Sequence, residues 1–187
     1  MHPELIYPRG AEKQVCMLSY YLAKFGHDVT IYTFEKKEPY IYDHLLEKVE
    51  VYSLKKKWAI GYPSVDVPRW SYLIKKISKK IESKNHEIIN AHNHPAQWIS
   101  YYTKKTVVWS CNEPYLYYQE KRDFKSNFYI WIDKHLSKKV KLILCLDPMM
   151  EEIIRSRYLN IKTFVTWSGV ELNQEVEHIE NDCFDVL

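Results

Sequence analysis

The sequence predicts an α/β protein built on a doubly wound, mostly parallel sheet. Strand-like and helix-like segments alternate along the chain, which is the order that crossover connections between parallel strands require. The length of 187 residues suits one such domain, and folding at this size buries roughly 70% of the surface of the unfolded chain. We expect the domain to span residues 1–172 and an acidic tail to span 173–187.

The first helix and the strand after it carry the clearest pattern. Apolar residues recur at steps of three and four, as on a helix that lies against a sheet: Ala11, Val15, Leu18, Leu22 and Phe25. Gly26 follows as a helix stop. The run from Val29 to Thr33 is rich in β-branched and aromatic residues and predicts a strand.

The later elements follow from the same rules. Short apolar runs predict strands at 49–52, 87–91, 106–111, 141–145 and 161–167. Helices are expected at 69–84, 96–103 and 126–137, and from Asp147-Pro148, an N-cap residue followed by a proline suited to the first turn. Because the segment 55–68 holds two prolines and a glycine, we expect it to be a loop, and we expect the same of 115–125.

The predicted helix from Arg69 to Lys84 has two contrasting faces. The apolar face consists of Trp70, Leu73, Ile74, Ile77 and Ile81, and the basic face of Lys75, Lys76, Lys79 and Lys80. Two interpretations compete, because the apolar face can pack on a sheet or lie on an anionic membrane surface. We favour packing, with the lysines still able to approach a membrane.

Charge and cysteine usage narrow the class of protein. The net charge of +3 divides into −5 for residues 173–187 and +8 for the rest, which favours anionic partners. The four cysteines form no C-x-x-C pair, and a reducing cytoplasm is the simplest compartment for them. We find no signal peptide or membrane-spanning run. Nucleic-acid binding is disfavoured because the lysines on the helix lack a reader motif.

Polar residues gather where the predicted strands end, which is where open α/β sheets bind ligands. Gly10 lets backbone approach a phosphate at the start of the first helix. His92 has a pKa suited to a phosphate or an acceptor hydroxyl, and Glu113 suits either a sugar hydroxyl or solvent. His92 and His94 lack a third ligand nearby, so we expect no metal, and no cofactor motif is found.

Five segments, in order, resemble the N-terminal domain of GT-B glycosyltransferases of the family 4 type. The turn at residues 9–12 resembles the family's G-G-x-E, and 26–33 resembles G-H-x-V-x-V-x-T. The strand at 87–92 ends in His92 as the family's H-x-H strand does. The segments 107–114 and 166–171 resemble the next strand and loop, and the closing N-G-V-D.

The resemblance implies a Rossmann-like fold and transfer of a sugar from a nucleotide-sugar to a glycan or lipid-linked acceptor, without a bound metal. It implies that Gly10 approaches the donor phosphates and that His92 lies near the reacting centre. It further implies that the substrate-binding residues include Glu12, Asn93, Asn112 and Glu113. Such an enzyme would be cytoplasmic, with peripheral membrane contact through the helix at 69–84.

Three departures from the family pattern shape what we expect. Arg9 stands where the first glycine of the turn is expected. The first strand is largely missing, because residues 2–4 resemble the loop that follows it, and this would leave a gap or an unpaired edge. The second domain does not follow Glu171. We therefore expect the acceptor-binding half of an enzyme, truncated at both ends or working with a second polypeptide that supplies the missing domain, and inactive alone. The alternative is a non-catalytic binding module or relic.

Overall fold

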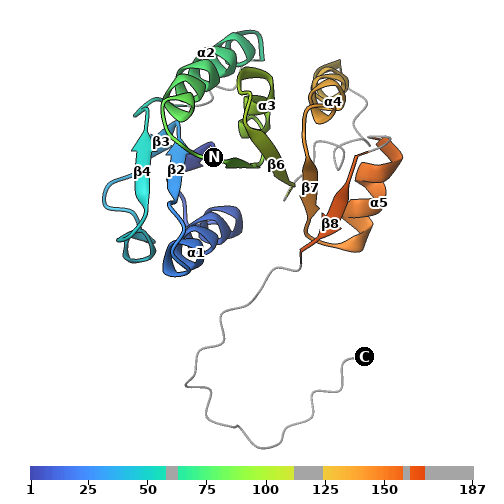
Figure 1. Cartoon of the computed structure of the whole chain (residues 1–187). Coiled ribbons are helices and arrows are strands. Elements are labelled where there is room, and N and C mark those ends of the chain that lie inside the picture. Colours follow the sequence, from blue (N-terminus) through green and yellow to red (C-terminus); the bar gives the residue numbers. More distant parts are fainter. Residues whose placement is uncertain (58–62, 112–123, 158–160, 167–187) are drawn as a thin grey trace, which may run out of the picture.

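Parallel strands form the centre of the molecule and helices cover both faces (Figure 1). The computed structural model describes residues 1–57, 63–111, 124–157 and 161–166. The strands are β1 Glu4–Leu5, β2 Thr30–Thr33, β3 Glu35–Lys36, β4 Glu50–Ser53, β5 Ile88–His92, β6 Thr106–Cys111, β7 Leu142–Cys145 and β8 Thr163–Val165. The helices are α1 Gly10–Lys24, α2 Pro63–Glu82, α3 Ile99–Tyr102, α4 Phe124–Ser137 and α5 Pro148–Arg157, with 3₁₀ turns η1 Asp43–Leu45 and η2 Ala96–Trp98.

Three sets of parallel strands are joined by the first residues of the chain. The sets are β1–β3, β2–β4 and β5–β6–β7–β8, and every pair in them is parallel. Met1 bonds to β5 on one side, where its amino group donates to Asn90 O (2.5 Å) and its C=O accepts from His92 N (2.9 Å). On the other side His2 N donates to Tyr32 O of β2 (3.0 Å).

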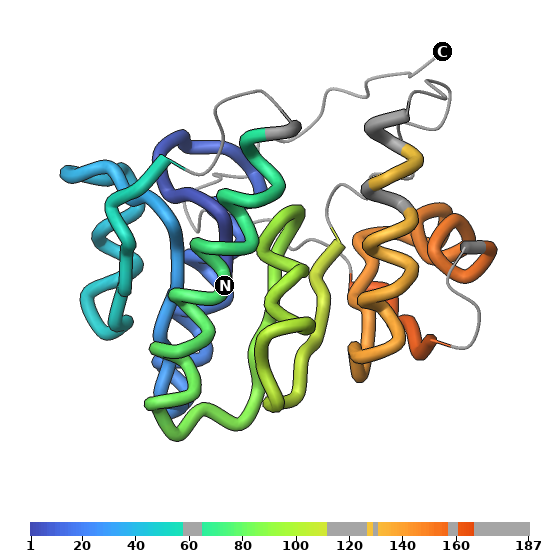
Figure 2. Tube along the Cα trace, turned by 90° about the horizontal axis from the view of Figure 1, so that it is seen from above, coloured from blue at the N-terminus to red at the C-terminus, as the bar shows by residue number. Residues whose placement is uncertain are grey.

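The resulting spatial order is β4, β2, the first residues, β5, β6, β7 and β8, so the chain enters at the centre of a doubly wound sheet (Figure 2). The prediction of the fold class is confirmed. The placing of residues 2–4 in a loop is wrong, because Met1–Pro3 carry sheet hydrogen bonds and Glu4 pairs with Glu35. The first strand is therefore short but central.

Helix α2 begins earlier than the sequence predicts, at Pro63 rather than Arg69. The expectation of a loop up to Pro68 is thus wrong for residues 63–68. A proline in the first turns of a helix removes few intrahelical bonds, because the first N–H groups have no partner within the helix. Pro63 takes the first position, where its missing N–H removes no intrahelical bond. Pro68 lies five residues further on, inside the helix, and removes one such bond.

The two faces of the sheet are covered unequally (Figure 1). Helices α2, α3, α4 and α5 lie on one face, and α1 lies on the other. All five apolar residues predicted for α2 are buried at 3% exposure or less, so the prediction that this face packs on the sheet is confirmed. A second, smaller core lies under α1 and includes Leu5, Val15, Cys16 and Ile31.

The predicted stripe of α1 is wrong at two positions. Leu18 is 38% exposed and Phe25 is 76% exposed. The buried residues of α1 are Glu12, Val15, Cys16 and Ser19. Two of these four are polar. Hydrophobic periodicity alone therefore predicts the wrong orientation for the buried face of the helix.

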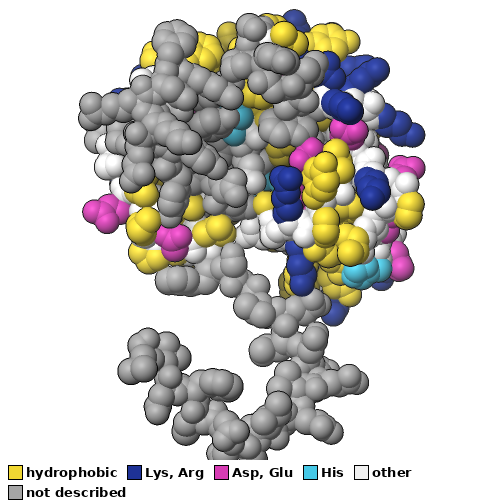
Figure 3. Space-filling model, turned by 180° about the vertical axis from the view of Figure 1, so that it is seen from behind, with side chains coloured by type: hydrophobic (Ala, Val, Ile, Leu, Met, Phe, Trp, Pro, Cys, Tyr) yellow, Lys and Arg dark blue, Asp and Glu magenta, His cyan; other side chains and the backbone are white. Residues whose placement is uncertain are grey.

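Charged side chains of both signs are interspersed with exposed hydrophobic ones on the described part of the face seen in Figure 3. Three acidic side chains of the described residues, however, are buried: Glu12, Asp66 and Asp133. Asp133 of α4 is 4% exposed, and burial raises the pKa of its carboxyl to about 7, although a contact with the Trp98 indole works against this.

We expect the change Ile77→Ala to lower the free energy of unfolding by about 2–5 kcal/mol, since it leaves a cavity under a fully buried side chain. The matched control is Tyr72→Ala on the same helix, where the side chain is 65% exposed. Urea denaturation measures both. Equal losses for the two variants would contradict the packing of α2.

We expect the free energy of unfolding to fall as the pH rises from 5 to 7, by on the order of 1 kcal/mol per pH unit, because of Asp133. The folded state keeps this acid protonated up to about pH 7, whereas the unfolded chain releases the proton near pH 4. Stability is therefore gained on acidification through this window. The Asp133→Asn variant lacks this titrating group. Denaturation of both proteins at pH 5, 6, 7 and 8 gives the free energy of unfolding at each pH, and the variant should show a smaller fall between pH 5 and pH 7.

Candidate functional site

Two histidines and a carboxylate meet at the carboxyl end of the central strands. His92 is the last residue of β5, and His2 lies on the neighbouring first segment. Because the backbone of Met1 bonds to β5, the two imidazole rings lie side by side, with centroids 6.3 Å apart and edges toward faces. The sheet itself therefore fixes their separation.

Glu12 reaches this pair from the first turn of α1. Its Oε1 lies 3.6 Å from Nε2 of His2, longer than a normal hydrogen bond but close enough for the carboxylate charge to act on the imidazole. Residues His2, Glu12 and His92 are all buried, at 4% exposure or less. We call these three residues the His2–Glu12–His92 cluster.

Burial dominates the electrostatics of the cluster. It lowers the pKa of His2, although Glu12 pulls this pKa upward. Burial, and then the amino terminus and His2, hold the pKa of His92 well below its usual range. Burial would raise the pKa of Glu12, but its contact with His2 lowers it more strongly, so the net shift is downward. At neutral pH the cluster therefore holds a carboxylate and uncharged imidazoles.

The cluster has hydrogen-bonding capacity to spare. Among the described residues, no partner is found for Nδ1 of His2, Nδ1 of His92 or Oε2 of Glu12. Buried polar atoms are normally paired, so each such atom calls for an explanation. A polar ligand at the carboxyl end of the sheet would supply one. A neutral imidazole could donate to a phosphate or hydroxyl oxygen there, or accept from a hydroxyl.

The start of α1 lies beside the cluster because Glu12 belongs to its first turn. Arg9 is the N-cap residue and gives no side-chain cap; its guanidinium lies 4.7 Å from the centroid of the Tyr7 ring. A Cβ placed on Gly10 would meet nothing within 4 Å among the described residues. Arg9 therefore does not cap the first N–H groups of the helix, and a helix start of this kind suits an anion.

The residues that follow His92 turn away from it. Asn93 adopts a left-handed backbone (φ 58°), which asparagine tolerates, and its N–H donates to Ser110 O (3.3 Å). The ring of His94 packs edge-on against Trp70 (4.9 Å) and Trp98 (5.1 Å). His92 and His94 thus have different neighbours. In the described ranges, no three His, Cys, Asp or Glu side chains are grouped as a metal site would require.

Two predicted site residues, Asn112 and Glu113, lie outside the described residues, as does the segment 168–171. His2, in contrast, was absent from the predicted site. Its position depends on a contact between distant residues, because the bond of His2 N to Tyr32 O places it at the carboxyl end of β2. Our placing of residues 2–4 in a loop concealed it. None of the described helices is both long and apolar enough to cross a bilayer.

The fold and the position of the cluster define a Rossmann-like α/β domain with a polar site at the carboxyl end of its sheet. The model of the family Glycosyltransferase Family 4 matches residues 8–174. This covers most of the chain, which therefore belongs to that family, as the sequence resemblance indicated. No curated protein matches the sequence significantly.

We expect Glu12→Gln to lower the pKa of His2 further, because the contact and the negative charge that raise this pKa are removed. Titration of the imidazole signals by NMR measures the change. Glu47→Gln, which alters an exposed carboxylate, is the control and should leave His2 unaffected. An unchanged or raised His2 pKa in the Glu12 variant would contradict the proximity of the two groups.

Proposed function

We propose that this chain is the acceptor-side half of an enzyme that transfers a sugar from a nucleotide-sugar to a glycan or lipid-linked acceptor. Membership of Glycosyltransferase Family 4 supports the sugar chemistry. The observation that carries the proposal furthest is the His2–Glu12–His92 cluster, which lies beside the uncapped start of α1. Neutral imidazoles and free backbone N–H groups are suited to a diphosphate-linked sugar.

Within this proposal each residue has a separate task. The N-terminus of α1, at Gly10, receives a phosphate of the donor. His92 hydrogen-bonds a sugar or acceptor hydroxyl near the reacting carbon and acts as the catalytic residue. Glu12 holds the orientation of His2 and, through it, the surroundings of His92. Asn93, with Asn112 and Glu113, completes the substrate contacts on the side of β6.

The remaining donor contacts would come from a second domain that closes over the carboxyl end of the sheet, and the first domain alone would have little transferase activity. For a lipid-linked acceptor, the lysine face of α2 offers a peripheral contact with the cytoplasmic face of a membrane. Because the apolar face of α2 is buried, that contact would be electrostatic and sensitive to salt.

We expect sugar transfer to appear only when the chain is mixed with a polypeptide that carries a family 4 C-terminal domain. Several nucleotide-sugars are tested with lipid-linked and glycan acceptors, and product formation is followed by mass spectrometry. Turnover by the chain alone would overturn the half-enzyme proposal. Absence of turnover with every candidate partner would favour the non-catalytic alternative.

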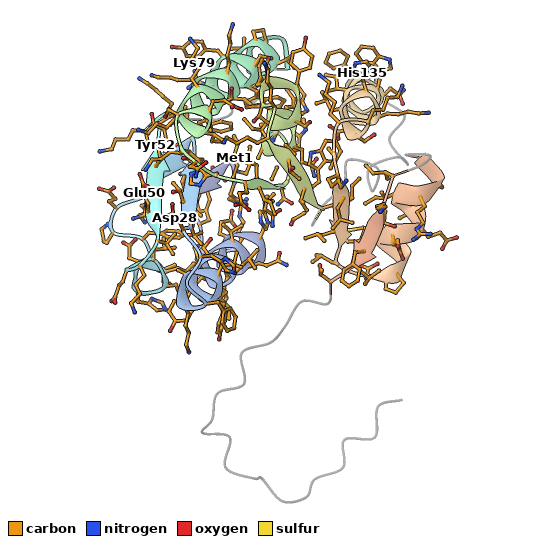
Figure 4. All side chains as sticks on the ribbon, in the orientation of Figure 1. Met1, Asp28, Glu50, Tyr52, Lys79 and His135 are labelled. Carbon is orange, nitrogen blue, oxygen red and sulfur yellow. The ribbon has the colours of Figure 1, made fainter. Side chains whose placement is uncertain are left out.

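In the active mixture, His92→Ala should lower kcat by about 10²–10⁴-fold, the range typical of losing a positioned proton-transfer group. The matched control is His135→Ala, on the exposed surface of α4 and distant from Met1 in Figure 4. A loss of the same size in both variants would contradict the assignment of His92.

A further inference from the structure

Helix α4 carries a ridge of aromatic rings on its exposed side. Phe128, Trp131 and His135 lie at steps of three and four residues, so they share one face of the helix. The ring centroids of Phe128 and Trp131 are 6.3 Å apart with an angle of 21° between the planes, and those of Trp131 and His135 are 6.2 Å apart with an angle of 19°. The three rings therefore form one continuous surface.

Trp131 is the most exposed hydrophobic residue of this ridge. It is 65% exposed, and Phe128 is 37% exposed. The inner side of α4 already serves the core, because Leu136 is buried there and Ile132 packs against it. Turning the helix to bury Trp131 would expose Leu136. The fold therefore keeps a large apolar ring at the surface, and such patches mark sites where another surface binds.

The aromatic surface continues onto α3 and α2. Tyr101 of α3 is 56% exposed and Tyr72 of α2 is 65% exposed. Lys139, just after α4, places its Nζ 4.6 Å from the centroid of the Tyr101 ring, a cation–π contact between the two helices. The three helices lie side by side on one face of the sheet (Figure 1, Figure 2). In Figure 4 Lys79 and His135 both lie along the upper side of this layer.

Exposed lysines surround the rings. Among the described residues of α2, α3 and α4, Glu82 is the one exposed acid, and it accepts from the hydroxyl of Thr103 and the N–H of Lys104. We call the exposed lysines and rings together the α2–α4 surface. It consists of Tyr72, Lys75, Lys76, Lys79, Tyr101, Phe128, Trp131, Lys134, His135, Lys138 and Lys139.

This combination of residues fits a lipid surface better than other partners. Tryptophan and tyrosine suit the layer between headgroups and acyl chains, because each has an apolar ring and a polar group. Lysines attract anionic headgroups. A protein partner fits less well, since lysine is depleted in protein interfaces. A neutral oligosaccharide would stack on the rings but would make no use of the positive charge.

We propose that the α2–α4 surface docks on an anionic lipid bilayer, with Trp131 in the headgroup layer and the lysines of α2 and α4 against the anionic headgroups. The surface extends the peripheral membrane contact that is part of the proposed function, and to that extent it rests on that function. It adds an apolar anchor on α4 to the electrostatic contact of α2.

Docking in this orientation leaves the His2–Glu12–His92 cluster accessible. Helices and strands of an α/β domain form stacked layers, so a domain that rests on the α2–α4 surface holds its strands roughly along the plane of the membrane. The carboxyl end of the sheet, where β5 ends at His92, then faces sideways. A lipid-linked acceptor would reach the cluster from the membrane without passing beneath the domain.

The test is co-sedimentation of the full chain with vesicles of phosphatidylcholine that contain about 30% phosphatidylserine, a probe for anionic membranes. We expect binding at least about tenfold tighter than to vesicles of phosphatidylcholine alone, because several lysines face the lipid. Equal binding to both vesicles would contradict the role of the lysines. Absence of binding to the anionic vesicles would overturn the proposal.

Trp131→Ala tests the aromatic anchor. We expect it to weaken vesicle binding at least about fivefold, because the buried area of a large ring is lost. The matched control is Phe25→Ala, which removes a ring that is 76% exposed at the end of α1, on the other face of the sheet. It should change binding less than about twofold. Equal effects of the two variants would overturn the anchor.

Salt separates the anchor from the lysines. At about 1 M NaCl the Debye length is about 3 Å, so the attraction between lysines and headgroups is screened. The unaltered chain should keep part of its binding under this condition, and Trp131→Ala should lose it. Complete loss in both proteins would contradict the entry of Trp131 into the headgroup layer.

Lys134→Glu tests the charge beside the anchor. We expect it to weaken binding to the anionic vesicles at least about fivefold, because a headgroup attraction becomes a repulsion. Lys24→Glu is the matched control, since it makes the same change of net charge at an exposed position of α1. Equal weakening by both variants would overturn the assignment of the surface, because it would show a response to net charge alone.

Two other occupants of the α2–α4 surface are outcomes that would overturn the proposal. Sedimentation velocity without lipid would reveal a second copy of the chain as a dimer that Trp131→Ala abolishes. Titration with maltohexaose would reveal a glycan site as a fluorescence change that Trp131→Ala abolishes. Because none of these measurements needs sugar transfer, failure of vesicle binding is distinguishable from failure of the proposed transferase function.

Discussion

The fold depends on the hydrogen bonds that Met1–Pro3 make on both sides. These residues are the only described backbone that joins the β2–β4 half of the sheet to the β5–β8 half. They also place His2 beside His92 and lead the chain into α1. The candidate site and the order of the strands both follow from the hydrogen bonds of this one short segment.

Burying the polar side chains of the His2–Glu12–His92 cluster costs folding free energy, and this cost points to a functional role. Burying three polar side chains with unsatisfied atoms is unfavourable unless something compensates. The contact between His2 and Glu12 offsets part of that cost, and burial keeps the histidines uncharged. A fold that carries such a cluster where parallel strands end is organised for a polar ligand, which agrees with its membership of Glycosyltransferase Family 4.

Helix α2 shows how tertiary packing decides between two uses of one pattern. Its sequence suits both a sheet-bound helix and a membrane-bound one, because each needs an apolar and a basic face. The burial of the whole apolar face commits it to the core and leaves the lysines as the surface. Helix α1 is the opposite case, because the core covers only part of its apolar stripe and leaves Leu18 and Phe25 exposed.

The sequence by itself determined the alternation of strands and helices, the family, and His92 at the end of a strand, since periodicity and strand-end chemistry are local properties. It did not reveal His2, because a segment as short as Met1–Leu5 carries no periodic signal. It misjudged the buried face of α1, where Glu12 and Ser19 lie inside. Only the tertiary structure decided these points, because hydrogen bonds between residues far apart in the chain set which side chains meet and which edges stay unpaired.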